Sequence, residues 1–331
     1  MSVSACFQCP RRCGATRADD GHVGFCGVPS AFRVARVSLH PFEEPCLCGA
    51  HGAGTVFFCG CNLRCVYCQN RDISHGDVRG ETLDSDTLSE RILALRDAGA
   101  ACLDLVTPTH YTRELIPLLR ALKPRLGIPV VWNSGGYEAV ESLRHLEGLV
   151  DVYLPDCKYF SSALSGQLSG APDYFPVACA ALAEMLRQVG NPVFDASGIL
   201  TRGVMVRHLV LPGHRADSIA LLEALAAEFG SSRFLLSLMS QYTPDFAAPD
   251  CEKSLHRRLT TFEYESVRDA ANRLGFRGYA QSLSSASAAY TPSWGREGCG
   301  GRGGRGGRGG RGGRGGRGGR GGRGGRVGET S

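Results

Sequence analysis

The 331-residue sequence lacks any apolar run long enough to cross a membrane, because no stretch approaches the length of about 18 residues that a membrane helix needs. The N-terminal stretch MSVSACFQCPRRCG also lacks the apolar core of a secretory signal, and it leaves little room before Cys6 for a transit peptide. We therefore expect a cytoplasmic protein with no membrane contact. In that reducing compartment, clustered thiols bind metal or carry out redox chemistry more often than they form disulfides.

Acidic side chains are nearly absent from the C-terminal segment. Residues 296–331 contain ten arginines and only two acids, so they carry a formal charge of +8, although the whole chain carries only +5. Residues 1–295 therefore carry −3 and form a mildly acidic body. After Trp294 the chain becomes nine GGR triplets ending at Arg326. Such a repeat cannot form a core, and we predict a disordered tail over residues 283–331.

The repeat has two interpretations. Arginine at every third position attracts phosphates, which predicts a weak, salt-sensitive RNA contact. The absence of aromatic side chains within the triplets excludes base stacking on aromatic rings. The alternative is a solubilising repeat with no dedicated ligand.

Short runs rich in Val, Leu, Ile or Phe alternate with helical patterns between residues 54 and 245. The predicted strands are Thr55–Cys59, Cys102–Thr107, Pro129–Asn133, Val150–Pro155, Gly203–Leu211 and Arg233–Met239. Between them apolar residues recur at helical spacing, as in Leu88, Ile92 and Leu95, which follow potential caps at Asp84 or Ser85. The stretch therefore predicts repeated strand–helix units.

Six such units predict an α/β fold with a mainly parallel sheet. Because six units are fewer than the eight of a closed barrel, we expect a partial (β/α)6 barrel with a closing helix at Glu263–Leu274. A doubly wound sheet is the alternative. We divide the chain into a cysteine-rich, metal-binding N-terminal extension (1–50), the partial barrel (51–282) and the tail (283–331).

Four of the fifteen cysteines fall within FFCGCNLRCVYCQN, residues 57–70. Three of them, Cys61, Cys65 and Cys68, have the spacing C-x3-C-x2-C on a loop that leaves the first predicted strand. Such a loop can place three thiolates around one face of a four-iron cube and leave one iron open to a small molecule. The carboxyl ends of the strands are where α/β enzymes place their sites. A zinc site or a chance grouping is the alternative.

The stretch CNLRCVYC resembles the signature of the radical S-adenosylmethionine (SAM) superfamily, including an aromatic residue, Tyr67, before the third cysteine. The resemblance implies a [4Fe-4S] cluster on these cysteines, whose open iron binds the amino and carboxylate groups of SAM. It implies reductive cleavage of SAM to methionine and a 5′-deoxyadenosyl radical, which abstracts hydrogen from a substrate. Six motifs in the same order, within residues 6–281, resemble the branch of that superfamily that is like pyruvate formate-lyase activating enzyme, and most closely its subgroup of uncharacterised activating enzymes. They are GTVFFCGCNLRCVYCQN, LVTPTHY, NSGGYE, DVYLPDCKY, RHLVLPG and SLMSQYTP.

The resemblance also implies residues that bind SAM. In place of the family's Gly-Gly-Glu motif after the second strand, this sequence has Thr107-Pro108-Thr109-His110, and the hydroxyls of Thr107 and Thr109 would accept from the SAM ammonium. Asn133, after the third strand, would meet the ribose, and Gln241, after the sixth, the adenine. We interpret the neighbouring NSGGYE as a tight turn.

Two cations complete the implied SAM site. Asp156-Cys157-Lys158 matches the family's Asp-x-Lys motif after the fourth strand, where the lysine pairs with the SAM carboxylate. Arg207 begins R-x-x-V-x-P-G on the fifth strand and would lie near the same carboxylate. A carboxylate in a partly dry pocket needs such fixed partners. The alternative is an ordinary surface ion pair.

A second group of cysteines, Cys6, Cys9, Cys13 and Cys26, has the spacing C-x2-C-x3-C-x12-C. Four thiolates in a reducing compartment predict metal binding, either as a closed zinc site or as a second [4Fe-4S] cluster. The sequence does not separate these two metals.

The leading hypothesis is thus a radical SAM enzyme acting on an unknown protein or small-molecule substrate. The resemblance suggests a glycyl-radical enzyme as partner and a reducing electron donor such as flavodoxin or ferredoxin. The alternative is a non-enzymatic adaptor, in which a zinc module and the arginine–glycine arm bind RNA. That alternative does not account for the six strand–helix units.

Overall fold

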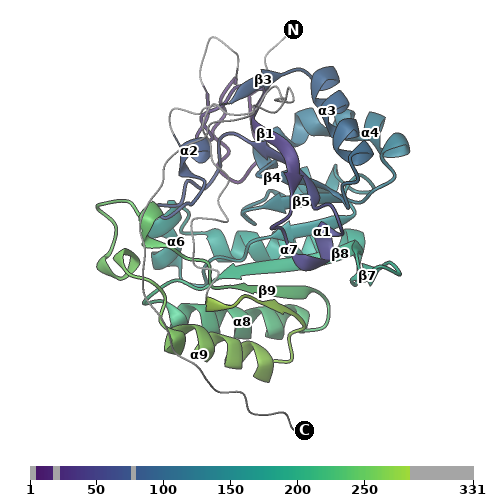
Figure 1. Cartoon of the computed structure of the whole chain (residues 1–331). Coiled ribbons are helices and arrows are strands. Elements are labelled where there is room, and N and C mark those ends of the chain that lie inside the picture. Colours follow the sequence, from purple (N-terminus) through teal and green to yellow (C-terminus); the bar gives the residue numbers. More distant parts are fainter. Residues whose placement is uncertain (1–4, 18–22, 76–79, 284–331) are drawn as a thin grey trace, which may run out of the picture. The chain divides into compact units, whose positions relative to one another are not determined.

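The computed structural model describes residues 5–17, 23–75 and 80–283 (Figure 1). The strands are β1 (Phe32–His40), β2 (Ala53–Phe58), β3 (Glu81–Leu83), β4 (Leu103–Val106), β5 (Val130–Ser134), β6 (Val152–Pro155), β7 (Val193–Phe194), β8 (Leu200–Leu209), β9 (Leu235–Met239) and β10 (Gly278–Ala280). The helices are α1 (Pro45–Cys48), α2 (Arg71–Ser74), α3 (Ser85–Asp97), α4 (Thr112–Leu126), α5 (Val140–Arg144), α6 (Ser162–Ser169), α7 (Tyr174–Val189), α8 (Arg215–Phe229) and α9 (Thr261–Arg273). No helix in the described ranges is long and apolar enough to cross a membrane.

The sheet has the order β10-β9-β8-β6-β5-β4-β2-β1-β3. From β2 to β10 neighbouring strands pair in parallel, and the order follows the chain without reversal. A doubly wound sheet would reverse direction at a switch point, whereas a barrel winds in one direction. The six predicted strands and the mainly parallel α/β architecture are therefore confirmed, and the doubly wound alternative is wrong.

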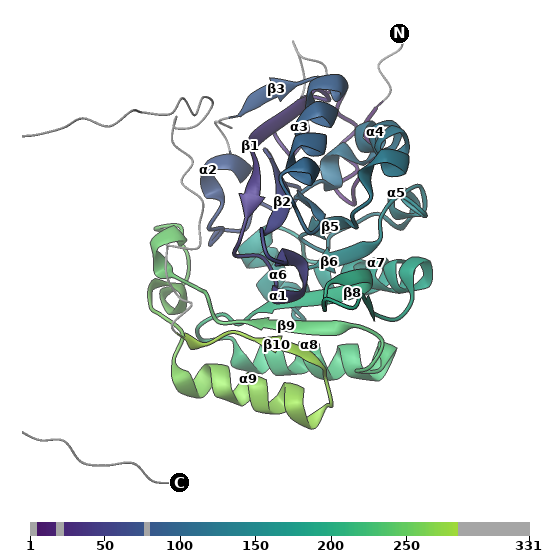
Figure 2. The same ribbon diagram turned by 45° about the vertical axis from the view of Figure 1, so that its right-hand side comes forward.

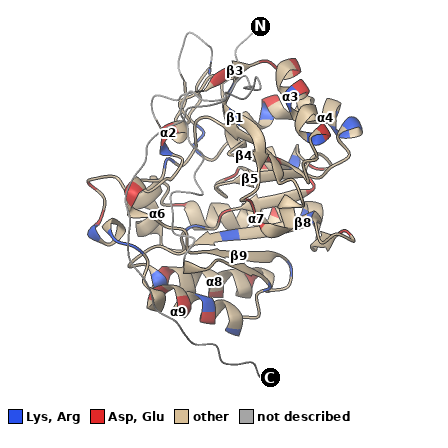
Figure 3. Cartoon of the chain, in the orientation of Figure 1, with Lys and Arg blue, Asp and Glu red and all other residues tan. Residues whose placement is uncertain are grey.

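The helices cover the outer side of the sheet. Figures 1 and 2 show α3, α4, α7 and α8 along this side. Apolar residues of α4 at helical spacing, such as Leu115, Leu119 and Leu122, are buried in the same core as Trp132 of β5 and Tyr153 of β6. Charged residues are concentrated on α3, α4, α8 and α9, whereas the strands are mostly uncharged (Figure 3).

The inner side of the sheet has an apolar layer and a polar layer. Alternate side chains of a strand point to opposite faces, so Val131 and Val152 point away from the helices and pack with Leu47 of α1. Two positions further along each strand, the same alternation places polar residues towards the carboxyl edge. These are Asp104 after Cys102, Asn133 after Val131, Asp156 after Leu154 and Arg207 after Met205. Polar groups from four strands therefore meet above an apolar floor.

The N-terminal region contributes more to the sheet than the sequence predicted. β1 pairs antiparallel with β2 and with β3, so residues 32–40 of the predicted extension are a strand of the main sheet. The strands β1, β3, β7 and β10 were not predicted. The domain division stays a prediction, and the predicted tail lies, beyond residue 283, outside the described residues.

The stretch NSGGYE forms a tight turn after β5. Gly136 has φ +75°, and a Cβ there would lie 2.0 Å from the carbonyl oxygen of Asp156, so only glycine fits. The turn buries Glu138, whose Oε1 accepts hydrogen bonds from Thr109 Oγ1 (2.7 Å) and Trp132 Nε1 (3.2 Å). Burial, partly offset by these donors, raises the pKa of Glu138 to about 7.

Replacing this carboxyl group should change how stability depends on pH. Because folding raises the pKa of Glu138, the folded state holds more protons between about pH 4.5 and 7, and the free energy of unfolding falls as pH rises through this range. We expect Glu138→Gln to remove about 2 kcal/mol of that fall between pH 5 and pH 8, measured by urea denaturation. The exposed Glu141→Gln is the control. Parallel pH profiles for Glu138→Gln and wild type would contradict the assignment.

Candidate functional site

A cavity of about 520 Å³ lies at the carboxyl edge of the parallel strands. Its wall includes the three cysteines of the loop after β2 and polar side chains that lie near the carboxyl ends of β5 and β8 or follow β4, β6 and β9. The predicted site residues that line it are Cys61, Cys65, Tyr67, Cys68, Thr107, Asn133, Asp156, Lys158, Arg207 and Gln241. Residues more than 180 positions apart in the sequence therefore share one cavity.

The three thiols lie in a tightly packed loop. Cys65 Sγ accepts a hydrogen bond from Ser169 Oγ at 3.0 Å, and Cys68 Sγ accepts one from Ser74 Oγ at 3.4 Å. Within the described residues, no fourth cysteine lines the cavity. Three thiol donors facing one cavity fit a cluster that has a fourth corner free of protein. Burial, reinforced by the neighbouring thiols, raises the pKa of Cys68 to about 12, so metal binding at this loop must release protons.

The spacing of the thiols differs from that of a single-ion site. Across the described part of the chain, no three His, Cys, Asp or Glu side chains are grouped so that they could hold one metal ion. In a four-iron cube each thiolate binds a different iron, so its ligands need not converge on one point. The donor set of this loop therefore fits a cluster.

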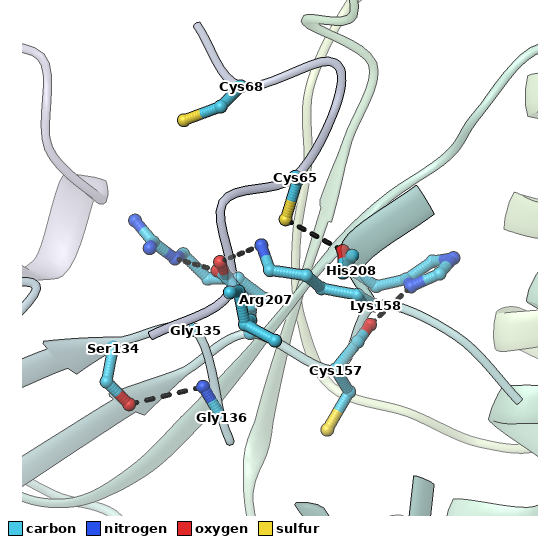
Figure 4. Close-up of polar contacts among 12 residues, drawn as sticks. Cys65, Cys68, Ser134, Gly135, Gly136, Cys157, Lys158, Arg207 and His208 are labelled. Carbon is cyan, nitrogen blue, oxygen red and sulfur yellow. Dashed lines mark hydrogen bonds and ion pairs between the residues drawn. The ribbon is translucent and has the colours of Figure 1, made fainter. Parts of the chain in front are cut away.

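Two cations converge on one carboxylate beside the loop. Lys158 Nζ lies 2.5 Å from Asp156 Oδ2, and Arg207 Nε lies 3.0 Å from Asp156 Oδ1. Arg207 also donates to Asn133 Oδ1 at 2.6 Å. Figure 4 shows Lys158 and Arg207 approaching the same carboxylate, with Cys65 and Cys68 on the loop above them. The cavity therefore carries fixed positive charge next to its thiols.

These ion pairs hold all three groups in their charged forms. Burial alone would raise the pKa of Asp156, but Arg207 and Lys158 outweigh it and keep that pKa below its ordinary value. Burial alone would lower the pKa of Lys158, but Asp156 and Cys65 outweigh it and raise that pKa above its ordinary value. The Lys158 side chain is 18% exposed, so the pair is largely sequestered rather than an ordinary surface ion pair.

Sequence reasoning missed the acidic side of the cavity. Glu43 and Glu44, which precede α1, both line it, and Glu43 lies 3.4 Å from Arg207. Burial and the adjacent Glu43 raise the pKa of Glu44 to about 7. Asp104 of β4 is fully buried and accepts from Asn133 Nδ2 at 3.2 Å. The sequence did indicate that Asp104 has a special role, because it lies inside the apolar run LDLV and aspartates are rarely buried without a partner.

Thr109 lies apart from the cavity. It is buried, does not line the cavity, and donates its hydroxyl hydrogen to Glu138. This placement does not support the predicted contact of Thr109 with SAM, which stays a prediction. His110 and His208 are likewise buried away from the cavity, bonded to the carbonyl oxygens of Cys59 (2.8 Å) and Cys157 (2.7 Å).

The second group of cysteines lies in the irregular N-terminal segment. Cys6, Cys9 and Cys26 are buried, and Cys13 is exposed. Burial, with smaller contributions from Cys26 and Cys6, raises the pKa of Cys9 to about 12. As at the three-cysteine loop, no three of these described thiols are grouped so that they could hold one metal ion, and metal binding there stays a prediction.

Comparisons with known proteins agree with the iron–sulfur interpretation. Residues 49–165, which include the three-cysteine loop, match the family model described as a 4Fe-4S single cluster domain. A protein of Methanocaldococcus jannaschii described as uncharacterized is 28% identical over 277 residues, covering 81% of this chain and 74% of that protein.

Two solved structures are similar at low identity. Streptococcus suis SuiB bound to the precursor peptide SuiA is 14% identical, with a TM-score of 0.47 over 68% of this chain and 48% of that one. Methylornithine synthase (PylB) is 15% identical, with a TM-score of 0.44 over 66% of this chain and 68% of that one. This chain thus spans about half the length of SuiB. The family match and the three-thiol loop beside the cavity together indicate a 4Fe-4S cluster domain within residues 49–165.

Proposed function

We propose that this protein binds SAM in the cavity and cleaves it reductively to start radical chemistry on a substrate. The observation that carries the proposal is the joint placement of Cys61, Cys65 and Cys68 with the Lys158–Asp156–Arg207 ion pairs on one cavity. When bound to the three thiolates, a [4Fe-4S] cluster supplies the electron that cleaves SAM to methionine and a 5′-deoxyadenosyl radical.

The chain's own residues bind and orient SAM. An ammonium has three donors, and Asp156 takes one of those on Lys158, so the group can pair with the SAM carboxylate as well. Arg207 is held by Asp156 and Asn133, which favours electrostatic support of the same carboxylate from a fixed direction. Gln241 and Thr107 line the cavity and supply amide and hydroxyl groups for the polar parts of SAM.

The radical then abstracts hydrogen from a substrate. The motif resemblance supports a glycyl-radical enzyme as that substrate, with hydrogen removed from a backbone glycine, and a small molecule or RNA fits the same chemistry. The electron donor we propose is a flavodoxin or ferredoxin. The arginine-rich tail would add a weak RNA contact. A zinc/RNA adaptor leaves the buried cations of the cavity without a role.

The first test is SAM cleavage by anaerobically purified protein reduced with dithionite. We expect 5′-deoxyadenosine from the wild type and none from Cys61→Ala, Cys65→Ala or Cys68→Ala, because two thiolates do not hold the cluster. Cys179→Ala, a half-buried cysteine of α7, is the matched control and should retain activity. Substantial product from any of the three loop variants would refute the assignment.

The second test measures SAM affinity by calorimetry. Lys158→Ala should weaken binding by about 1.5–3 kcal/mol, the range for a hydrogen bond to a charged group. Lys123→Ala removes a comparable ion pair, with Asp151, on residues that do not line the cavity, and should leave the dissociation constant unchanged. Equal affinities for Lys158→Ala and wild type would exclude Lys158 from the SAM site.

We also propose metal binding at Cys6, Cys9, Cys13 and Cys26. Metal analysis of a triple variant, Cys61→Ala/Cys65→Ala/Cys68→Ala, isolates this site. We expect about one zinc or about four irons per chain to remain, the two stoichiometries that four thiolates allow. Adding Cys9→Ala should remove that metal. A triple variant that contains no metal would show that these thiols are not ligands.

A further inference from the structure

A chain of buried hydroxyl groups leads to one of the three loop thiols. Tyr67 Oη lies 2.6 Å from Tyr159 Oη, which lies 2.7 Å from Ser169 Oγ. Ser169 Oγ in turn lies 3.0 Å from Cys65 Sγ. All four residues are at most 7% exposed, so water does not compete for these hydrogen bonds.

The chemistry of the sulfur sets the direction of this chain. A metal-bound thiolate can only accept, so Ser169 must donate its single hydroxyl hydrogen to Cys65. Ser169 can then only accept from Tyr159, and Tyr159 from Tyr67. Each hydroxyl thus polarises the next towards the sulfur. This hydrogen bond is shorter than those from Leu63 N to Cys61 Sγ (3.3 Å) and from Ser74 Oγ to Cys68 Sγ (3.4 Å).

Independent contacts hold the serine in place. Ser169 is the last residue of α6, whose Leu168 carbonyl accepts from the backbone N–H of Val66 at 2.9 Å. Arg11 donates to the carbonyl oxygens of Ser169 (2.8 Å) and Asn62 (2.8 Å). The end of α6 is therefore joined to the cysteine loop before Cys65 through Arg11 and after Cys65 directly through Val66.

We propose that Ser169 is a positioning residue that raises the reduction potential of the cluster through its hydrogen bond to Cys65. The inference rests on the proposed function, because it requires the cluster. Reduction adds negative charge that is shared by the ligating sulfurs, so a donor aimed at one sulfur stabilises the reduced state more than the oxidised state. Tyr159 acts through Ser169 by fixing the direction of its hydroxyl.

The experiment is a redox titration of the full-length, cluster-containing protein, followed by electron paramagnetic resonance. At a fixed applied potential, Ser169→Ala should lower the ratio of reduced to oxidised cluster about tenfold, which is 59 mV for one electron. Ser169→Thr keeps the hydroxyl and should restore most of the ratio. Tyr159→Phe keeps the serine and should shift the ratio in the same direction by less.

The matched control is Ser165→Ala on the same helix. Ser165 is 1% exposed, but its hydroxyl donates to the Ser162 carbonyl and not to sulfur, so the ratio should not change. Equal ratios in Ser169→Ala and Ser165→Ala would overturn the inference. If the Ser169→Ala variant holds no cluster, the Tyr159→Phe variant tests the inference in its place. A lower ratio of reduced to oxidised cluster in Tyr159→Phe supports the inference, and an unchanged ratio overturns it. A wild type that forms no cluster, or forms one but no 5′-deoxyadenosine, defeats the proposed function instead.

Discussion

The carboxylate of Asp156 is the group on which the arrangement of the cavity depends. It follows β6 and pairs with Arg207 of β8 and with Lys158 two residues further along the chain. Arg207 also reaches Glu43, so charges of alternating sign run from Glu43 through Arg207 and Asp156 to Lys158. Removing one member of a buried series leaves its neighbours uncompensated, which costs more than the loss of an exposed ion pair. The series ends at the ammonium group of Lys158, which lines the cavity. An anionic group of a bound ligand would continue the alternation of charge there.

Two further acidic groups near this series, Asp104 and Glu44, have raised pKa values, which limits the negative charge that they add. Burial and Glu43 raise the pKa of Asp104 well above its ordinary value, which favours the protonated form of this carboxyl group. Glu44, with a pKa of about 7, sits near the point of half-ionisation in neutral solution. The cavity thus has a firmly charged side at Lys158 and Arg207 and a side where protonation is adjustable. A ligand with a carboxylate at one end and cationic groups at the other matches this polarity.

Much of this arrangement could be predicted because it follows from local patterns. Parallel strands place their carboxyl ends at one edge, so Asn133, Asp156 and Arg207 had to lie close together once the strands were recognised. Glu43 and Glu44 could not be assigned in the same way. They precede a one-turn helix, α1, and reach the cavity only because β1 pairs antiparallel with β2. Thr109 shows a related limit of sequence reasoning. Its position after β4 predicted a ligand contact, but its hydroxyl group donates to the buried carboxyl group of Glu138.

The N-terminal segment acquires a physical role from its contacts with the cysteine loop. Residues 5–17 contain no helix or strand, and backbone hydrogen bonds from Cys6 N to the Ala15 carbonyl (2.9 Å) and from Gly14 N to the Cys6 carbonyl (3.1 Å) close them into a loop. From this loop Arg11 stacks on Phe25 at 4.0 Å and donates to the carbonyl oxygens of Asn62 in the cysteine loop and of Ser169 at the end of α6. Contacts of Gln8 attach the segment to the domain as well, because its side chain accepts from the backbone N–H of Arg113 at 2.7 Å and its backbone carbonyl accepts from Ser142 Oγ at 2.7 Å. A metal on the four thiols, as proposed above, would restrain the segment further. The proposed metal at the first group of cysteines would then steady the loop on which the second group lies.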